Sequence, residues 1–95
     1  MLSLGTSLTN QNAAAVLRDG LSRVAQGGMQ VDLQVDCTAL EQVDSSAVAV
    51  LLAWQRAAAA RHGKLALSGV PQQLAELAFV YGVDSLLGLD PSHRH

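Results

Sequence analysis

Several features that would place a chain in a particular class are scarce or missing here. Cys37 is the one cysteine, so no intrachain disulfide can form, and a reducing compartment fits. No apolar run approaches the ~20 residues that a membrane-spanning helix needs. The first residues also lack the basic and long apolar segments of a signal peptide. The sequence therefore predicts a cytoplasmic protein that does not insert into a membrane.

Positive charge is not clustered in this sequence either. Six Lys and Arg side chains stand against eight Asp and Glu, which gives a formal net charge of −2, and they form no cationic block. Nucleic acids and anionic lipid surfaces are bound largely through such blocks. We therefore expect neither of them as a partner.

The motifs of common enzyme classes are absent from the sequence as well. It has no glycine-rich phosphate-binding loop, no residues at metal-ligand spacing, and no nearby histidine to activate Ser45. His93 and His95 flank Arg94, but two terminal histidines without a third ligand do not make a metal site. We interpret residues 90–95 as a frayed tail, and we expect no catalytic residue, no metal and no cofactor.

Hydrophobic periodicity divides the 95 residues, enough for one domain, into alternating strands and helices. Val31, Leu33 and Val35 alternate with polar residues, as in a strand that buries one face. Strands are expected near residues 2–5, 30–36 and 64–68, and helices near residues 12–26, 45–62 and 71–81. This order predicts an α/β fold with a small, mostly parallel or mixed sheet and about three helices packed mainly on one face. The polar alternation predicts that the other face of the sheet is wet or only thinly covered.

The segment from Asp44 to His62 is the one around which the chain is organised. Asp44 is the expected N-cap, because an Asp oxygen accepts the free backbone N–H groups of a first helical turn. Ser45 and Ser46 then open the helix, so a hydroxyl lies in the positive potential of a helix N-terminus, where an added phosphate is tolerated. The alternative is a capped helix with no further role.

This helix carries more apolar surface than one core-facing stripe requires. At helical spacing, a second row lies beside the core row and contains Ala47, Val50, Trp54, Ala57 and Arg61. Trp54 flanked by alanines has the composition of an interface anchor, so we interpret the row as a partner-binding face. The alternative places Trp54 under the tail or at the sheet edge.

Two blocks of the sequence resemble the STAS domain, a module shared by sulphate transporters and anti-sigma-factor antagonists. The first runs from Val35 to Ala47, with a strand ending in Asp, an irregular loop, and Asp-Ser-Ser-Ala before an apolar helix. The second is Leu65–Pro71, which leads into the last helix. The resemblance covers nearly the whole chain and implies a single STAS-like domain over residues 1–95. Ala47 departs from the usual Gly and adds a Cβ where a partner or phosphate approaches.

Within that family the chain is most similar to the small MlaB-like subunit of Mla-type phospholipid ABC transporters, which act in outer-membrane lipid asymmetry. This resemblance implies a non-enzymatic adaptor that binds the transporter's ATPase subunit through the helix beginning at the signature. Asp44 and Ser45 occupy the signature positions. The implied location is cytoplasmic and peripheral to the inner membrane through the complex. The sequence ends without the long final helix of anti-sigma-factor antagonists, which favours the MlaB-like branch.

The alternative branch is the anti-sigma-factor antagonists, whose partner is an anti-sigma factor kinase. Here the resemblance implies regulation by phosphorylation of Ser45, with Ser46 as the second choice, and the Ser-Ser pair leans toward this branch. Phosphorylation adds nearly two negative charges at the protein–protein contact.

The family's usual first strand is missing from this sequence. We therefore expect the Leu2–Leu4 edge of the sheet to pair with another copy, as a homodimer, or to be covered by a loop.

Overall fold

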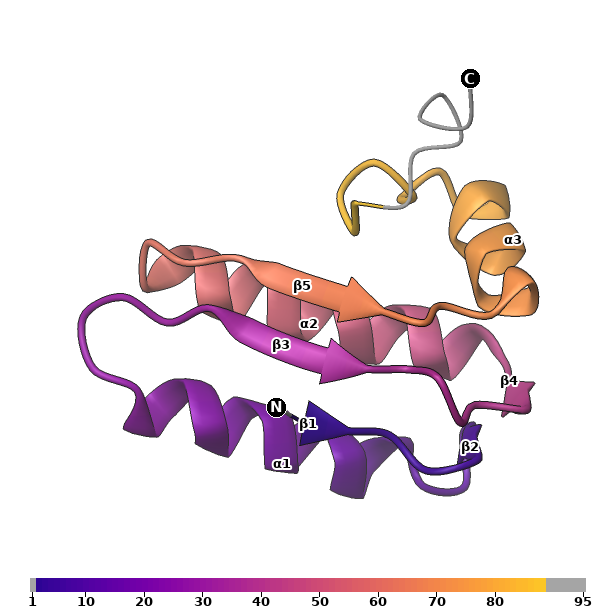
Figure 1. Ribbon diagram of the computed structural model, residues 1–95, viewed down its shortest axis with the longest axis horizontal. Coiled ribbons are helices and arrows are strands. Elements are labelled where there is room, and N and C mark those ends of the chain that lie inside the picture. The colour runs from indigo at the N-terminus through magenta and orange to yellow at the C-terminus, as the bar shows by residue number, and fades with distance from the viewer. Residues whose placement is uncertain (1, 89–95) are drawn as a thin grey trace.

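The computed structural model describes residues 2–88 and shows strands and helices in alternation (Figure 1). The helices are α1 (Ala13–Gln26), α2 (Ser45–Ala60) and α3 (Gln72–Val80). The strands are β1 (Leu2–Ser3), β2 (Ser7–Leu8), β3 (Leu33–Asp36), β4 (Gln42–Val43) and β5 (Leu65–Ser68). The three predicted helices and three predicted strands are confirmed, although the observed strands are shorter. The predicted tail, residues 90–95, lies outside the described residues.

The main sheet has three parallel strands in the order β1-β3-β5. Leu2 aligns with Val35, and Leu33 aligns with Leu65, so each strand continues through a crossover helix to a parallel neighbour. The predicted α/β class is therefore confirmed. Strands β2 and β4 form a separate parallel pair that the sequence did not indicate, since two-residue strands carry no readable period.

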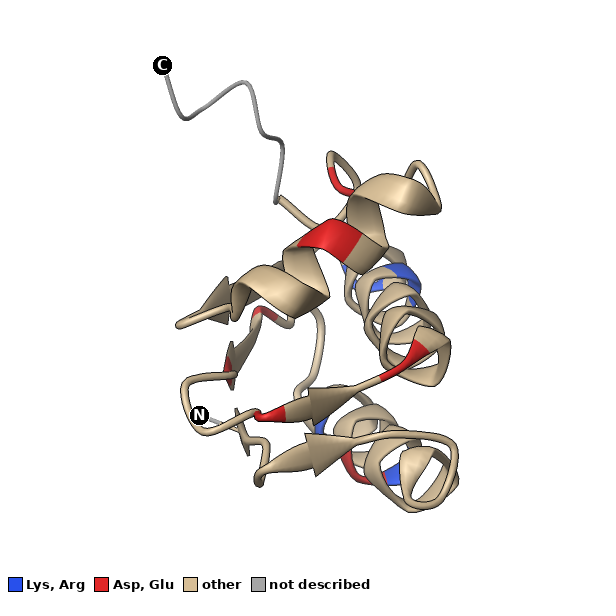
Figure 2. Cartoon of the chain, turned by 90° about the vertical axis from the view of Figure 1, so that its right-hand side faces the viewer, with Lys and Arg blue, Asp and Glu red and all other residues tan. Residues whose placement is uncertain are grey.

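Helices α1 and α2 both cover the same face of this sheet, as the ribbon shows in two views (Figures 1 and 2). Leu33 and Val35 point to that face and are buried, whereas Gln34 between them is exposed. In β5, Leu65 and Leu67 are half-buried and alternate with exposed Ala66 and Ser68. The structure therefore confirms one covered and one wet face.

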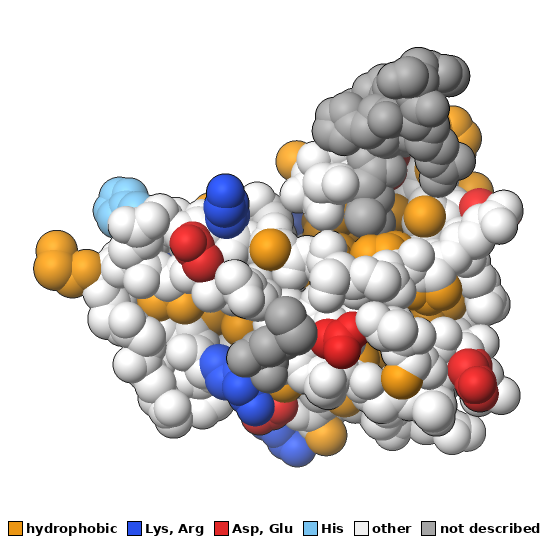
Figure 3. Space-filling model, in the orientation of Figure 1, with side chains coloured by type: hydrophobic (Ala, Val, Ile, Leu, Met, Phe, Trp, Pro, Cys, Tyr) orange, Lys and Arg blue, Asp and Glu red, His pale blue; other side chains and the backbone are white. Residues whose placement is uncertain are grey.

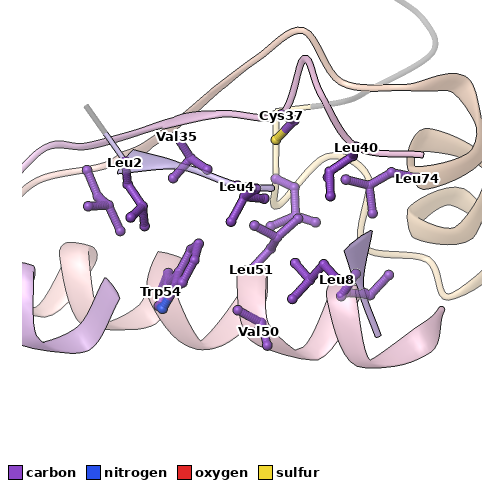
Figure 4. Packing of buried hydrophobic residues seen from close by; sticks show 14 of the residues in the cluster. Leu2, Leu4, Leu8, Val35, Cys37, Leu40, Val50, Leu51, Trp54 and Leu74 are labelled. Carbon is purple, nitrogen blue, oxygen red and sulfur yellow. The ribbon is translucent and has the colours of Figure 1, made fainter. Parts of the chain in front are cut away.

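The core lies between this sheet face and the two helices (Figure 4). Trp54 is completely buried there, and its indole Nε1 donates to the backbone oxygen of Leu17 at 3.0 Å. Ala47 and Val50 are also buried, with 0% and 3% of their surface exposed. The prediction that these three side chains form an exposed partner face is therefore wrong. Their row is covered by α1 of the same chain, which supplies the apolar contact that we had assigned to a partner.

Helix α3 packs against α2 through Leu74 and Ala78, both of which have no exposed surface. The helix ends within one residue of the predicted boundary at 81, and Gly82 follows in the left-handed region at φ +72°. The Gly82 N–H donates to the oxygen of Phe79 at 2.9 Å, and the Val83 N–H donates to the oxygen of Ala78 at 2.9 Å. This pair of bonds is the Schellman motif, and it turns the chain back toward α2.

The two blocks that carry the STAS resemblance contact each other at the ends of β3 and β5. The Cys37 N–H donates to the oxygen of Ser68 at 2.8 Å. Gly69 follows at φ +63°, and a Cβ there would overlap the side chain of Thr38. Glycine is therefore required by both the backbone conformation and the close approach.

Candidate interface at the start of helix α2

Asp44 caps helix α2, as the sequence predicted. Its Oδ1 accepts the N–H of Ser46 at 2.8 Å, and the backbone has the extended conformation of an N-cap. Its Oδ2 accepts the N–H of Asn10 at 3.1 Å, so the same carboxylate also holds the loop before α1 against the start of α2. The Asn10 N–H, followed by the Ser46 donors, holds the pKa of Asp44 below its ordinary value, with desolvation opposing.

Ser45 is exposed at the first position of α2, where the helix N-terminus places it in positive potential. Ser46 is half-buried and lies one position further along. Of the two serines, Ser45 is thus the more accessible to a partner or a modifying enzyme.

A shallow apolar groove of about 340 Å³ begins at Ser45. One wall is the stripe of Val48, Ala49 and Leu52, which follow Ser45 at helical spacing on α2. The other wall is formed by Tyr81 and Val83, which the Schellman turn brings back alongside α2. The groove therefore joins the signature serine to the segment that follows α3.

Large apolar side chains are also exposed at the end of α3 and in the turn that follows it. Phe79, Val80 and Tyr81 are 62%, 76% and 55% exposed, and Leu86 is 57% exposed. Hydrophobic side chains are visible on the surface around α3 (Figure 3). We name these four side chains and the groove the α2–α3 surface. The sequence analysis missed it, although three consecutive apolar residues at the end of a predicted helix were a usable signal.

The other residues predicted for the partner face do not join this surface. Ala57 and Arg61 are half-buried and lie roughly 18–24 Å along α2 from Ser45, at 1.5 Å per residue. The Arg61 guanidinium donates to the backbone oxygen of Gly28, which ties the end of α2 to the turn after α1. Ala47 is fully buried in the core. Its Cβ therefore does not face a partner, contrary to what the resemblance to STAS domains had implied.

Elsewhere in the described part of the chain, few side chains are placed to bind a metal or to react as a nucleophile. Residues 2–88 contain no group of three or more His, Cys, Asp or Glu side chains that could hold a metal ion. Cys37 is buried, and burial together with the nearby Asp36 charge raises the pKa of its thiol to about 11. The terminal His93 and His95 lie outside the described residues.

No helix among residues 2–88 has both the length and the apolar character required to cross a membrane.

Comparison with known proteins identifies the family. Residues 1–88 match a family model described as "Mlab, STAS domain". No curated protein matches the chain. The matched region contains both sequence blocks, the capped α2 helix and the α2–α3 surface. The chain therefore belongs to the MlaB-like family of STAS domains.

Proposed function

We propose that this protein is a non-enzymatic adaptor that binds and regulates the ATPase subunit of an Mla-type phospholipid ABC transporter through the α2–α3 surface. The supporting observation is the apolar groove that begins at the exposed signature residue Ser45 and extends to exposed Tyr81. The family match supports the same assignment. STAS domains are generally regulatory or adaptor modules, and in this proposal the chain acts at the cytoplasmic side of the inner membrane through its transporter.

The physical reason for a protein partner is the amount of apolar side chain that faces water on one end of the molecule. Scattered surface hydrophobic residues are ordinary, but contiguous ones bordering a groove mark interaction sites. Phe79 and Tyr81 are aromatic residues of the kind enriched in interface cores. Burying them against a partner contributes roughly 25 cal/mol per Å² of apolar surface removed from water.

Filling the groove tests this proposal. Ala49 lines the groove and is exposed, so Ala49→Gln adds bulk without disturbing the core. We expect it to weaken binding to the Mla ATPase subunit of the same organism by about tenfold, or ~1.4 kcal/mol. The free energy of unfolding should change by less than about 0.5 kcal/mol, because the site is on the surface.

Ala59→Gln is the matched control, since Ala59 is also exposed on α2 but lies away from the groove. It should leave both binding and stability close to those of the unmodified protein. Wild-type protein that fails to bind the ATPase subunit would refute the proposal, as would equal effects of the two substitutions.

The alternative is an anti-sigma-factor antagonist whose partner is an anti-sigma factor kinase. Exposure of Ser45 beside the helix cap favours it, because phosphate added there would lie at the border of the groove. In that case a candidate kinase should bind the unmodified protein and phosphorylate Ser45. The Ser45→Asp variant should not bind the kinase. Ser45→Ala should bind but resist phosphorylation, as followed by mass spectrometry.

A further inference from the structure

We infer that Arg56 determines which partner the α2–α3 surface accepts, by pairing with a carboxylate of the ATPase subunit; this inference rests on the proposed function. The occupant is a segment of that subunit with an apolar side chain in the groove and an Asp or Glu beside Arg56. At 1.5 Å per residue, the carboxylate lies about 10 Å along α2 from the groove wall at Ala49.

Arg56 lies on the outward face of α2 in line with the groove wall. It follows Ser45 by eleven positions and Ala49 by seven. At about 100° per residue, it is therefore within roughly 20° of both of them around the helix axis. Leu52 also lines the groove and is the neighbour of Arg56 one helical turn earlier. A partner that follows this stripe out of the groove therefore meets the guanidinium next.

Arg56 is exposed and has no charged partner in the part of the chain that the structure describes. Among residues 2–88, the one ion pair joins Arg23 to Asp19. The Arg61 guanidinium is held by the backbone oxygen of Gly28. The side chains three and four positions from Arg56 on the same helix offer it no carboxylate, since they are Leu52, Ala53, Ala59 and Ala60. Its pairing capacity thus remains available to a partner.

Arg56 is also the one charged side chain of α2. The neighbouring alanines are short, so the backbone of a partner that covers the stripe comes close to the guanidinium. A guanidinium presents a planar fork of N–H donors that matches the two oxygens of a carboxylate. Arginine is also enriched among the residues that contribute most to binding at interfaces. The complementary group on the partner is therefore an Asp or Glu.

The same observations disfavour two other occupants. Anionic lipid surfaces are bound through clusters of Lys and Arg, whereas Arg56 is the single cation on α2. A second copy packed antiparallel along α2 would bring its Asp44 toward Arg56. Both oxygens of Asp44 already accept backbone N–H groups, from Ser46 and Asn10. Recruiting that carboxylate would weaken the helix cap, so a different protein is the better match.

Binding of the full-length protein to the Mla ATPase subunit of the same organism tests the role of this charge. Arg56→Gln should weaken binding about fivefold at low salt, and Arg56→Glu about fiftyfold, because a reversed charge repels the partner carboxylate. Both losses should shrink at high salt. Neither substitution should change the melting temperature, because the side chain is exposed.

Arg18 provides the matched control, since it is an exposed arginine on α1, a helix that does not line the groove. Arg18→Gln and Arg18→Glu change the net charge of the protein by the same amounts. They should bind the ATPase subunit within about twofold of wild type, because long-range charge alone is screened over a few ångströms of salt solution.

Crosslinking identifies the group that Arg56 meets. Arg56→Lys keeps the positive charge and supplies an amine, which a carbodiimide joins to a contacting carboxylate as an amide. Mass spectrometry should find position 56 linked to an Asp or Glu of the ATPase subunit, and Arg18→Lys should give no such link at position 18. Replacing the linked acid by Arg in the ATPase subunit should restore much of the binding that Arg56→Glu loses.

Each outcome is decisive. If the ATPase subunit binds and Ala49→Gln weakens that binding, but the Arg56 variants behave like the Arg18 variants, the inference is wrong and the proposed function stands. If the wild-type protein does not bind the ATPase subunit, both are wrong. A link from position 56 to an acid of a second copy, with none to the ATPase subunit, overturns the inference in favour of a homodimer.

Discussion

The indole ring of Trp54 packs against Gly20 at the point where α2 crosses α1, and a Cβ placed on Gly20 would overlap the ring. Gly20 is buried although it lies in the middle of a helix, where glycine costs about 1 kcal/mol relative to alanine. The close contact accounts for this glycine. It provides the space in which the largest side chain of the core is held.

Gly20→Ala should therefore destabilise the protein by about 1–3 kcal/mol, even though alanine is the better helix former. The melting temperature should fall by about 4–8 °C for each kcal/mol of lost stability in a domain of this size. Ser22→Ala, at an exposed position of the same helix, should shift it by less than the equivalent of ~0.5 kcal/mol. A stabilised Gly20→Ala variant would show that the ring does not occupy this space.

Trp54→Ala should lower the free energy of unfolding by about 3–5 kcal/mol, because a large buried side chain is lost and a cavity remains. Urea titration followed by circular dichroism measures this, since the variant lacks the only tryptophan. The control is Phe79→Ala, which removes an aromatic side chain that is 62% exposed. It should leave stability within about 0.5 kcal/mol while weakening partner binding. The reverse result would restore the exposed-anchor interpretation of Trp54.

Asp44 has two structural roles that substitution can separate. Asp44→Ser retains a side-chain oxygen that caps Ser46, but a single short hydroxyl does not also reach Asn10. Asp44→Ala removes both contacts. We expect the melting temperature to decrease in the order wild type, Asp44→Ser, Asp44→Ala. Faster amide exchange at Asn10 should appear in both variants, and exchange equal to that of wild type would argue against the contact.

Stability should fall in acid because hydrogen bonds lower the pKa of both Asp44 and Asp36 in the folded state. The main donors are the Asn10 N–H for Asp44 and the Thr38 hydroxyl for Asp36. A lowered folded-state pKa gives stability that is complete above the ordinary Asp value of about 3.9 and is lost as the pH falls below it. Melting curves between neutral and strongly acidic pH should show this loss, and it should be smaller in Asp44→Ala.

Cys37 should resist thiol reagents in the folded protein. It has no exposed surface, and burial raises the pKa of its thiol to about 11, so little reactive thiolate forms at neutral pH. A chromogenic thiol reagent should label it slowly in buffer and rapidly in concentrated urea. Fast labelling of the native protein would mean that the end of β3 opens readily.

Strand β1 forms an edge of the main sheet, so the expected pairing with another copy stays a prediction. The Leu4 N–H donates to the backbone oxygen of Asp36 at 3.0 Å, which directs the alternate N–H of Ser3 away from β3. Ser3→Pro should reduce self-association without breaking the β1–β3 pairing, because proline is tolerated at sheet edges. Light scattering over a concentration series measures this. A strict monomer with a freely exchanging Ser3 amide would exclude both the homodimer and a covering loop.

Local sequence determined much of this protein, because the signals involved act over a few residues. The alternation of Leu33, Gln34 and Val35 specified a strand with one buried face, and the oxygen of Asp44 specified where α2 begins. Gly82 likewise specified the end of α3. Each depends on backbone geometry or on a neighbouring N–H, so one sequence is sufficient to read it.

Only the tertiary structure decided which apolar surface is covered. Helix α2 is apolar on two adjoining faces, and periodicity does not indicate whether the second is buried by the same chain or by a partner. Gly20, more than thirty positions before Trp54, settles this by letting α1 approach closely enough to bury the indole. The groove likewise joins Ser45 on α2 to Val83, which lies 38 positions later in the chain. Such long-range contacts depend on how whole elements pack, and hydrophobic pattern alone does not encode which faces meet.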